Sequence, residues 1–227
     1  MYYFIFIIYN NMPIYNINNK KVLFIHIPKN YGSFIELLLE KLSSTHYIRK
    51  NSVFNEELLY GQYMQLQYQH LTSNQIESLT DYKINDFDIV FALLREPIEK
   101  LLSEINWRMF HVSKQETYKG KTKDQIIKLI VNRYNSTTYL MRDGGHNRTQ
   151  LDFINGHIDK IRLFTDLTEC VDFLKKELDI DIDIDTTKKT GNASKNYVTK
   201  EDIYRLYPNI DLILQDDIDF YNSINNL

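Results

Sequence analysis

The stretch FIHIPKNYGSF, residues 24–34, joins the end of an apolar run to the beginning of a helix-like pattern. Pro28 ends the apolar run, because proline has no N–H group to give to a neighbouring strand. Lys29, Gly32 and Ser33 follow directly, and apolar residues at helical spacing come after them. The stretch therefore predicts a strand, a tight turn and a helix, in that order.

Two further segments repeat this order of features. The apolar runs at residues 21–27, 87–94 and 161–165 are continuous rather than alternating, which is typical of strands buried on both faces. An amphipathic helical pattern follows each run. Strands that alternate with helices in this way indicate an α/β fold with a central, mostly parallel sheet flanked by helices.

Length and composition fit one domain. A chain of 227 residues with 43% apolar content can bury one sizeable core. We expect a single domain over residues 20–227, preceded by an edge strand or a flexible tail over residues 1–19. The apolar residues after Met1 are too few to span a bilayer, which needs roughly 20, and they lack the positively charged start of a signal peptide. We therefore expect a cytoplasmic protein without a membrane span.

Charge and cysteine content limit the possible partners. The formal net charge of −3 does not favour nucleic-acid binding, so any anion site must be local. Cys170 is the only cysteine, which excludes an internal disulfide and a zinc site built from several thiolates. No metal ion is expected. The helical pattern around Cys170 predicts a packed, unreactive thiol.

The first loop, residues 28–33, has the features of an anion site. A helix that begins near Ser33 directs free N–H groups and its positive dipole end at the loop. Lys29 adds a charge, and Gly32 permits a close approach. These features suit a phosphate-like group. The alternative is an ordinary turn in which Ser33 caps the helix and Lys29 is solvated. The lysine precedes the glycine, unlike in the Walker motif, which disfavours a standard magnesium-dependent nucleoside triphosphatase.

The second loop, residues 95–97, lies in the segment ALLREPIEKLLSEINW, residues 92–107. Arg95 follows the predicted strand, and Pro97 occupies the favoured first position of a helix. Arg95 and Ser103 together can hold a phosphate, the arginine by a forked contact. The alternative is a surface ion pair of Arg95 with a neighbouring glutamate, Glu96 or Glu99.

The two loops are expected to lie side by side. In open α/β sheets, ligands bind outside the carboxyl ends of the strands, and both loops follow such ends. Two anion sites at adjacent strand ends predict a ligand with two separated anionic groups.

The residues of both loops resemble those of a known family. FIHIPKNYGSFIE is similar to the pattern PKTGGTS, and LLREPIEKLLSE to the pattern R-[DN]-P-x-x-R-x-x-S, of sulfotransferases that use 3′-phosphoadenosine-5′-phosphosulfate (PAPS). The closest resemblance is to carbohydrate O-sulfotransferases such as the heparan sulfate 2-O and 6-O enzymes. The resemblance implies a P-loop-like three-layer fold. It also implies that PAPS is held at its 5′ end by Lys29, Asn30, Tyr31, Gly32 and Ser33 and at its 3′-phosphate by Arg95 and Ser103.

The chain departs from the family pattern at several positions. Tyr31 replaces the first glycine, so we expect the backbone there to avoid a glycine-only conformation. Phe34 replaces a small residue, Glu96 replaces Asp or Asn, and Lys100 replaces the second arginine.

Sulfuryl transfer to a hydroxyl, with a carbohydrate as the expected acceptor, needs a base and a cation. Lys29 is the candidate for stabilising charge on the leaving oxygen. His70 is the candidate base, because the related glycan enzymes place a catalytic histidine in a similar context. His26 is the rival, but its apolar strand favours a structural, hydrogen-bonded histidine. Two other functions stay open: an atypical P-loop-like nucleotide or small-molecule kinase, and a degenerate family member that binds nucleotide without catalysis.

Overall fold

The computed structural model describes residues 13–43, 45–46, 68–111, 118–134, 145–181 and 197–225. The apolar residues 1–12, on which the predicted edge strand or tail mainly rests, lie outside these ranges. The remaining described residues of the 1–19 segment form strand β1 and the turn to the next strand.

The described strands form one sheet in the order β3-β1-β2-β4-β5. Their bounds are β1 Ile14–Ile17, β2 Lys20–Phe24, β3 Thr45–His46, β4 Ile89–Leu93 and β5 Arg162–Phe164. β2 pairs in parallel with β4, and β4 with β5, while β1 pairs antiparallel with both β2 and β3. Four strands therefore share one direction, and β1 runs the opposite way. This confirms an α/β fold with a mostly parallel sheet, built from the three apolar runs of the sequence.

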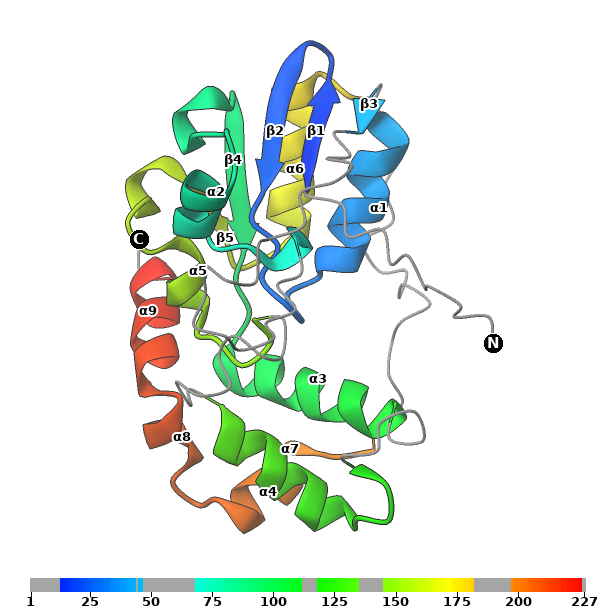
Figure 1. Ribbon diagram of the computed structural model, residues 1–227, viewed down its shortest axis with the longest axis vertical. Coiled ribbons are helices and arrows are strands. Elements are labelled where there is room, and N and C mark those ends of the chain that lie inside the picture. Colours follow the sequence, from blue (N-terminus) through cyan, green and yellow to red (C-terminus); the bar gives the residue numbers. More distant parts are fainter. Residues whose placement is uncertain are drawn as a thin grey trace, which may run out of the picture.

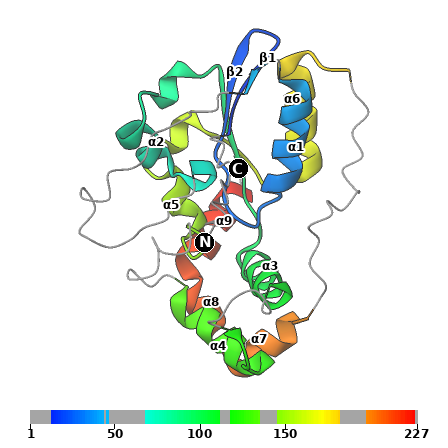
Figure 2. The same cartoon turned by 45° about the vertical axis from the view of Figure 1, so that its right-hand side comes forward.

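Alternate residues of β2 enter two different cores, one on each face of the sheet. Val22 and Phe24 pack with helices α1 (Gly32–Leu42) and α6 (Leu167–Leu178). Leu23, and Ile25 directly after β2, pack with helices α2 (Ser73–Leu79), α5 (Gln150–Ile154) and α9 (Gln215–Asn225). Figure 2 shows α1 and α6 on one side of the sheet and α2 and α5 on the other. The sheet is thus the middle of three layers, as its continuous apolar strands require.

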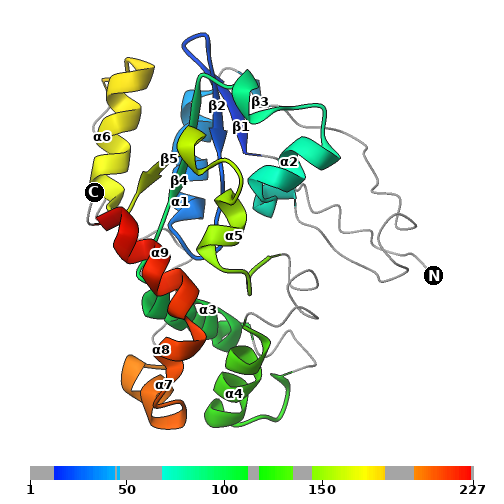
Figure 3. The same ribbon diagram turned by 90° about the vertical axis from the view of Figure 1, so that its left-hand side faces the viewer.

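A group of helices lies beyond the carboxyl ends of the parallel strands (Figure 1). This helical group consists of α3 (Pro97–Phe110), α4 (Lys123–Arg133), α7 (Lys200–Leu206) and α8 (Ile210–Ile213). It has its own apolar cluster, with Leu101, Ile127 and Ile203 fully buried. Figure 3 shows α9 running from α8 up to the sheet, so that the end of the described chain joins the helical group to the three layers.

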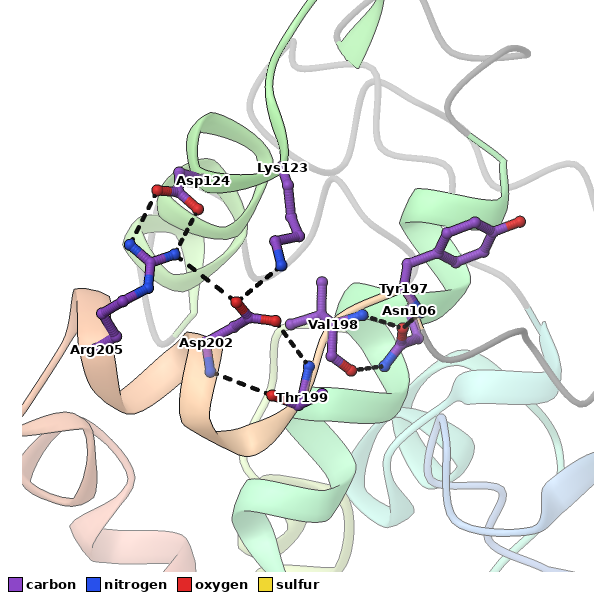
Figure 4. Close-up of polar contacts among 8 residues, drawn as sticks. All are labelled: Asn106, Lys123, Asp124, Tyr197, Val198, Thr199, Asp202 and Arg205. Carbon is purple, nitrogen blue, oxygen red and sulfur yellow. Dashed lines mark hydrogen bonds and ion pairs between the residues drawn. The ribbon is translucent and has the colours of Figure 1, made fainter.

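Polar contacts fix α7 against α3 and α4 (Figure 4). Asn106 of α3 accepts hydrogen bonds from the N–H groups of Tyr197 and Val198 and donates one to the Val198 carbonyl. Arg205 of α7 forms two hydrogen bonds to Asp124 of α4. The amide of Asn106 is buried, so its contacts define how the last described segment enters the helical group.

Helix starts in the described chain carry the expected capping residues. Thr72, Thr122 and Thr199 each accept a hydrogen bond from the third residue of α2, α4 or α7, whose side chain bonds back to the cap. Asp166 caps α6 by accepting a hydrogen bond from the third residue of that helix, with no bond back to the cap. The last described segment forms α7, α8 and α9, and Pro208 lies between α7 and α8. Short 3-10 helices occupy Tyr68–His70, Ile84–Asp86 and Ile158–Lys160.

The sequence also predicts a buried cysteine and no membrane span. Cys170 is buried in α6, so the prediction of a packed cysteine is confirmed, and burial raises the pKa of its thiol, which disfavours the reactive thiolate. Of the helices in the described part of the chain, none has the length and apolar character needed to cross a membrane.

Candidate functional site

The first loop follows β2 and contains two residues in the left-handed region of backbone space. Lys29 has φ 71° and Tyr31 has φ 63°, a conformation that costs a residue with a side chain roughly 1–2 kcal/mol. Tyr31 therefore takes a conformation that glycine favours but that is not restricted to glycine. Tyr31, not Ser33, is the residue before α1, and the helix begins at Gly32.

The N-terminus of α1 presents donors to this loop. Tyr31 O accepts hydrogen bonds from Phe34 N and Ile35 N, which belong to the first turn. Within the described ranges, the N–H groups of Gly32 and Ser33 have no acceptor. These two donors, together with the positive end of the helix dipole, are the anion-binding feature predicted for the first loop.

Gly32 is required by the side chain of His26. A Cβ atom built on Gly32 lies 1.7 Å from His26 Nε2, so any other residue would collide with the imidazole. His26 is buried, and its Nδ1 donates to Glu36 Oε1 of α1 at 2.7 Å. The expected hydrogen bonding of His26 is confirmed, and its structural role stays a prediction. Gly32 serves the approach of a side chain rather than a positive φ angle.

Arg95 connects the second loop to the first. Its Nη1 donates to the Lys29 carbonyl at 3.2 Å, and its guanidinium lies over the Tyr31 ring, 5.4 Å from the ring centroid. Arg95 also forms a 3.4 Å ion pair with Glu99, which was the alternative reading of this arginine. Glu96 caps α3 by accepting from Ile98 N and Glu99 N. The pairing of β2 with β4 thus places the two loops side by side, as predicted.

The ammonium of Lys29 lies over the ring of Trp107 in α3, 4.9 Å from the ring centroid. Burial lowers the pKa of Lys29 to about 8. The carboxylate of Glu104 raises this pKa, while the charges of Arg95 and Arg108 lower it further. A desolvated cation beside other cations is a position that an anion would stabilise.

Ser103 lies on the same face of α3 as the residues that these two cations contact. Glu99, Ser103 and Trp107 are spaced four residues apart, which places their side chains in one row on a helix. Arg95 contacts the first of the three and Lys29 the last. Ser103 is half-buried between them in this row, and its predicted contact with a phosphate stays a prediction.

Gln150 of α5 joins the two loops, a role that no local pattern in the sequence indicates. Its Oε1 accepts from Arg95 N and from Asn30 Nδ2, and its Nε2 donates to Arg95 O at 2.8 Å. Asn30 also donates to Leu93 O at the end of β4. The side chain of Asn30 therefore points into the protein, and its hydrogen bonds hold the first loop against the second. Asp217 of α9 accepts from the N–H of Gln150.

Lys100, which stands where the family pattern has arginine, is directed away from the two loops. Its ammonium is fully buried and donates to the Tyr134 hydroxyl and to the Arg148 carbonyl, both at 3.0 Å. Burial lowers the pKa of Lys100, and the charge of Asp217 opposes that effect. The residue joins α3 to α4 and α9 and adds no charge to the candidate site.

His70 belongs to a cluster of three imidazoles, which we call the histidine cluster: His26, His70 and His146. The ring centroid of His70 lies 4.4 Å from that of His26 and 5.2 Å from that of His146. His70 Nδ1 donates to the His26 carbonyl, and Gln69 donates to His70 Nε2. Burial, and then the charges of His26 and His146, lower the pKa of His70 well below its usual range, so it is neutral.

His146 connects this cluster to Lys29. Its ring stacks on Trp107 with the centroids 5.4 Å apart, and its Nδ1 donates to Glu104 Oε2 at 2.9 Å. Glu104 also pairs with Arg108 and is fully buried. Burial raises the pKa of Glu104, but His146, Arg108 and Lys29 together lower it more, and it lies well below its usual range. Position alone could have suggested Glu104, since it follows Ser103, whereas nothing in the sequence links it to His146.

No family model, no curated protein and no solved structure matches this chain. Within the described ranges, no group of three or more histidine, cysteine or carboxylate side chains is arranged to hold a metal ion. The function is therefore argued from the site, which unites residues from the ends of β2 and β4 with the row on α3 and the histidine cluster. The tyrosine-rich residues 60–67, noted near His70 in the sequence, lie outside the described part of the chain.

Proposed function

We propose that the chain is a sulfotransferase that moves the sulfuryl group of PAPS to a hydroxyl group, with a carbohydrate as the expected acceptor. The observation that carries this proposal is the contact between the loops: Arg95 bonds the carbonyl of Lys29 at the N-terminus of α1. Two cations that follow adjacent parallel strands suit a ligand with two anionic ends. The proposal includes a P-loop-like fold, with the first loop as the phosphate loop.

The first loop would hold the 5′-phosphosulfate. The unbonded N–H groups of Gly32 and Ser33 and the ammonium of Lys29 supply donors and positive charge there. When the sulfur–oxygen bond breaks, the negative charge on the bridging oxygen would be stabilised by Lys29. Arg95 and Ser103, with Glu99 as the counter-ion that a phosphate would displace, would hold the 3′-phosphate.

The transfer also needs a proton acceptor near Lys29. The histidine cluster, which includes the candidate His70, supplies imidazoles at the same end of the sheet. A neutral imidazole can accept a proton, and burial keeps His70 neutral. Positioning and charge stabilisation by protein groups would then account for catalysis, as in phosphoryl transfer.

Calorimetry with adenosine 3′,5′-bisphosphate, the product nucleotide, tests the proposal directly. We expect binding by the wild type and at least about tenfold weaker binding by Lys29→Ala and Arg95→Ala. The proposal is refuted if the wild type does not bind the bisphosphate, or if Lys29→Ala binds it with unchanged affinity. Binding without turnover of PAPS would identify a non-catalytic nucleotide-binding protein, and phosphoryl transfer that requires magnesium would identify a kinase.

A further inference from the structure

Two histidines of the cluster differ in the use of their second ring nitrogen. Both ring nitrogens of His70 are engaged, one by the His26 carbonyl and one by the Gln69 amide. In His146 only Nδ1 is engaged, by Glu104. Among the described residues, the Nε2 atom of His146 has no hydrogen-bond partner. The difference matters because a catalytic base needs a free ring nitrogen to take the proton of the acceptor hydroxyl.

The contact with Glu104 fixes the state of the His146 ring. A carboxylate only accepts hydrogen bonds when ionised, so the proton of a neutral His146 lies on Nδ1 and the lone pair on Nε2. Glu104 is held ionised by its three positive or donating neighbours, with its pKa well below the usual range. A buried carboxylate behind an imidazole orients the ring and stabilises the imidazolium that forms when the ring takes a proton.

The ring and the cation of the site contact the same side chain, that of Trp107. Trp107 contacts both groups, since the His146 ring stacks on it and the Lys29 ammonium lies over it. The side chain of His146 keeps 12% of its surface exposed, while His70 is 6% exposed as a residue. His146 therefore combines an oriented ring, an unused lone pair and contact with the tryptophan over which Lys29 lies.

From this arrangement we infer that His146, oriented by Glu104, is the catalytic base of the site and that His70 is a positioning residue. The inference rests on the proposed function. In the step, the acceptor hydroxyl gives its proton to Nε2 of His146 while its oxygen forms a bond to the sulfur of PAPS. The bond between sulfur and the bridging oxygen breaks, and its electron pair stays on that oxygen, next to Lys29. The products are a sulfate ester and adenosine 3′,5′-bisphosphate, and His146 then releases the proton to water.

His70 supports this arrangement from behind. Its ring lies between His26 and His146 and is tied to the main chain of His26 at the end of β2. A change at His70 would disturb the cluster without removing the proton acceptor. We therefore expect variants of His70 to retain more transfer than variants of His146.

The test uses purified full-length chain and PAPS labelled with radioactive sulfur, and it measures release of labelled sulfate to water. Water is the simplest hydroxyl acceptor, so the natural acceptor need not be known. The main variant is His146→Asn, whose amide can still donate to Glu104 but which lacks the second ring nitrogen. His70→Asn is compared with it, and His157→Asn is the matched control. His157 is equally exposed at 12% and pairs with Ser73 and Glu77, away from both loops.

We expect His146→Asn to lower the rate by about 100-fold or more, the usual contribution of a general base. Its affinity for adenosine 3′,5′-bisphosphate should stay within about twofold of wild type, which also shows that it is folded. If it does not bind the bisphosphate, His146→Gln replaces it in the same assay. His70→Asn should lose less activity than His146→Asn, and His157→Asn should match wild type.

Each other outcome contradicts a defined statement. A folded His146 variant that retains the wild-type rate, or a greater loss in His70→Asn, overturns the assignment of the base and leaves the proposed function standing. Wild type that binds the bisphosphate but releases no sulfate also overturns the assignment. Wild type that fails to bind the bisphosphate refutes the proposed function, and the assignment with it.

Discussion

The imidazole of His26 occupies the space in which a side chain at position 32 would begin. A Cβ atom on Gly32 would lie 1.7 Å from His26 Nε2, and the ring is held there by its hydrogen bond to Glu36. The glycine of the first loop is therefore coupled to the residues that follow β2 and lead into the loop. This coupling fixes where α1 begins and thus where its free N–H groups point.

Gly32→Ala should destabilise the protein by about 1–3 kcal/mol, because the new methyl group must displace the buried His26 ring. His26→Ala should also destabilise it, since it leaves a cavity and removes the partner of Glu36. The double variant should be no less stable than His26→Ala alone, because the ring that blocks the methyl group is absent. Urea unfolding of the four proteins measures this coupling. If the stability losses of the two single variants simply add in the double variant, the His26 ring is not the reason why residue 32 is glycine.

Tyr31 is the second unusual residue of the first loop, with φ 63° just before α1. Asparagine tolerates this left-handed conformation, whereas a β-branched residue does not. Tyr31→Asn should therefore change the free energy of unfolding by less than about 1 kcal/mol, and Tyr31→Val should lower it by about 1–2 kcal/mol more. The side chain is 43% exposed, so lost burial is a minor term for either variant. Equal stability of the two variants in urea would contradict the backbone explanation.

The sequence predicts the parts of the site that lie next to strand ends. Lys29 and Arg95 follow continuous apolar runs, and parallel strands bring their ends together, so their proximity could be expected. Ser103 could be placed from helical spacing alone. These inferences need only the period of a strand or a helix and the rule on where such sheets bind ligands.

The rest of the site depends on contacts between distant segments, which local patterns do not contain. Glu104 and His146 are 42 residues apart, and Gln150 is 55 residues from Arg95. The left-handed backbone of Tyr31 was not predicted either, because tyrosine gives no local signal for it. Lys100 was read as a substitute for a ligand-binding arginine, but the helical group needs a buried donor to Tyr134 at that place.

Gln150 should be essential for holding the two loops together. Gln150→Ala leaves the N–H and the carbonyl of Arg95 without their partner and removes one acceptor from Asn30. Unmade hydrogen bonds of buried groups cost about 1–3 kcal/mol each, so we expect a loss of about 2–4 kcal/mol in urea unfolding. The affinity for adenosine 3′,5′-bisphosphate should fall as well, because both anion sites lose their relative position.

Gln125 provides the control for this variant. Its side chain also accepts a hydrogen bond from a main-chain N–H group, that of Thr122, but it is exposed in α4 and distant from the loops. Gln125→Ala should cost no more than about 1 kcal/mol and should leave nucleotide affinity unchanged. If Gln150→Ala binds the bisphosphate as tightly as Gln125→Ala does, Gln150 does not position the two loops.

Lys29 should make stability and ligand binding depend on pH in opposite directions. Its pKa is about 8 in the folded protein and 10.5 in the unfolded chain, with burial as the main cause. Between these values the unfolded chain binds more protons, so the free energy of unfolding should rise as pH increases from about 8 to 10. Over the same range the folded protein loses the ammonium, so the affinity for adenosine 3′,5′-bisphosphate should fall.

Lys29→Met separates these two effects, because it removes the charge and keeps most of the side-chain volume. Relief of the buried ammonium should stabilise the variant by roughly 1–3 kcal/mol at pH 7, remove the rise in stability above pH 8, and weaken bisphosphate binding at least about tenfold. Lys128→Met, at an exposed position of α4, should do none of this. Urea unfolding and calorimetry at several pH values measure both quantities. A Lys29→Met variant that is less stable than wild type at pH 7 would show that Glu104 and Trp107 stabilise the ammonium more than burial destabilises it.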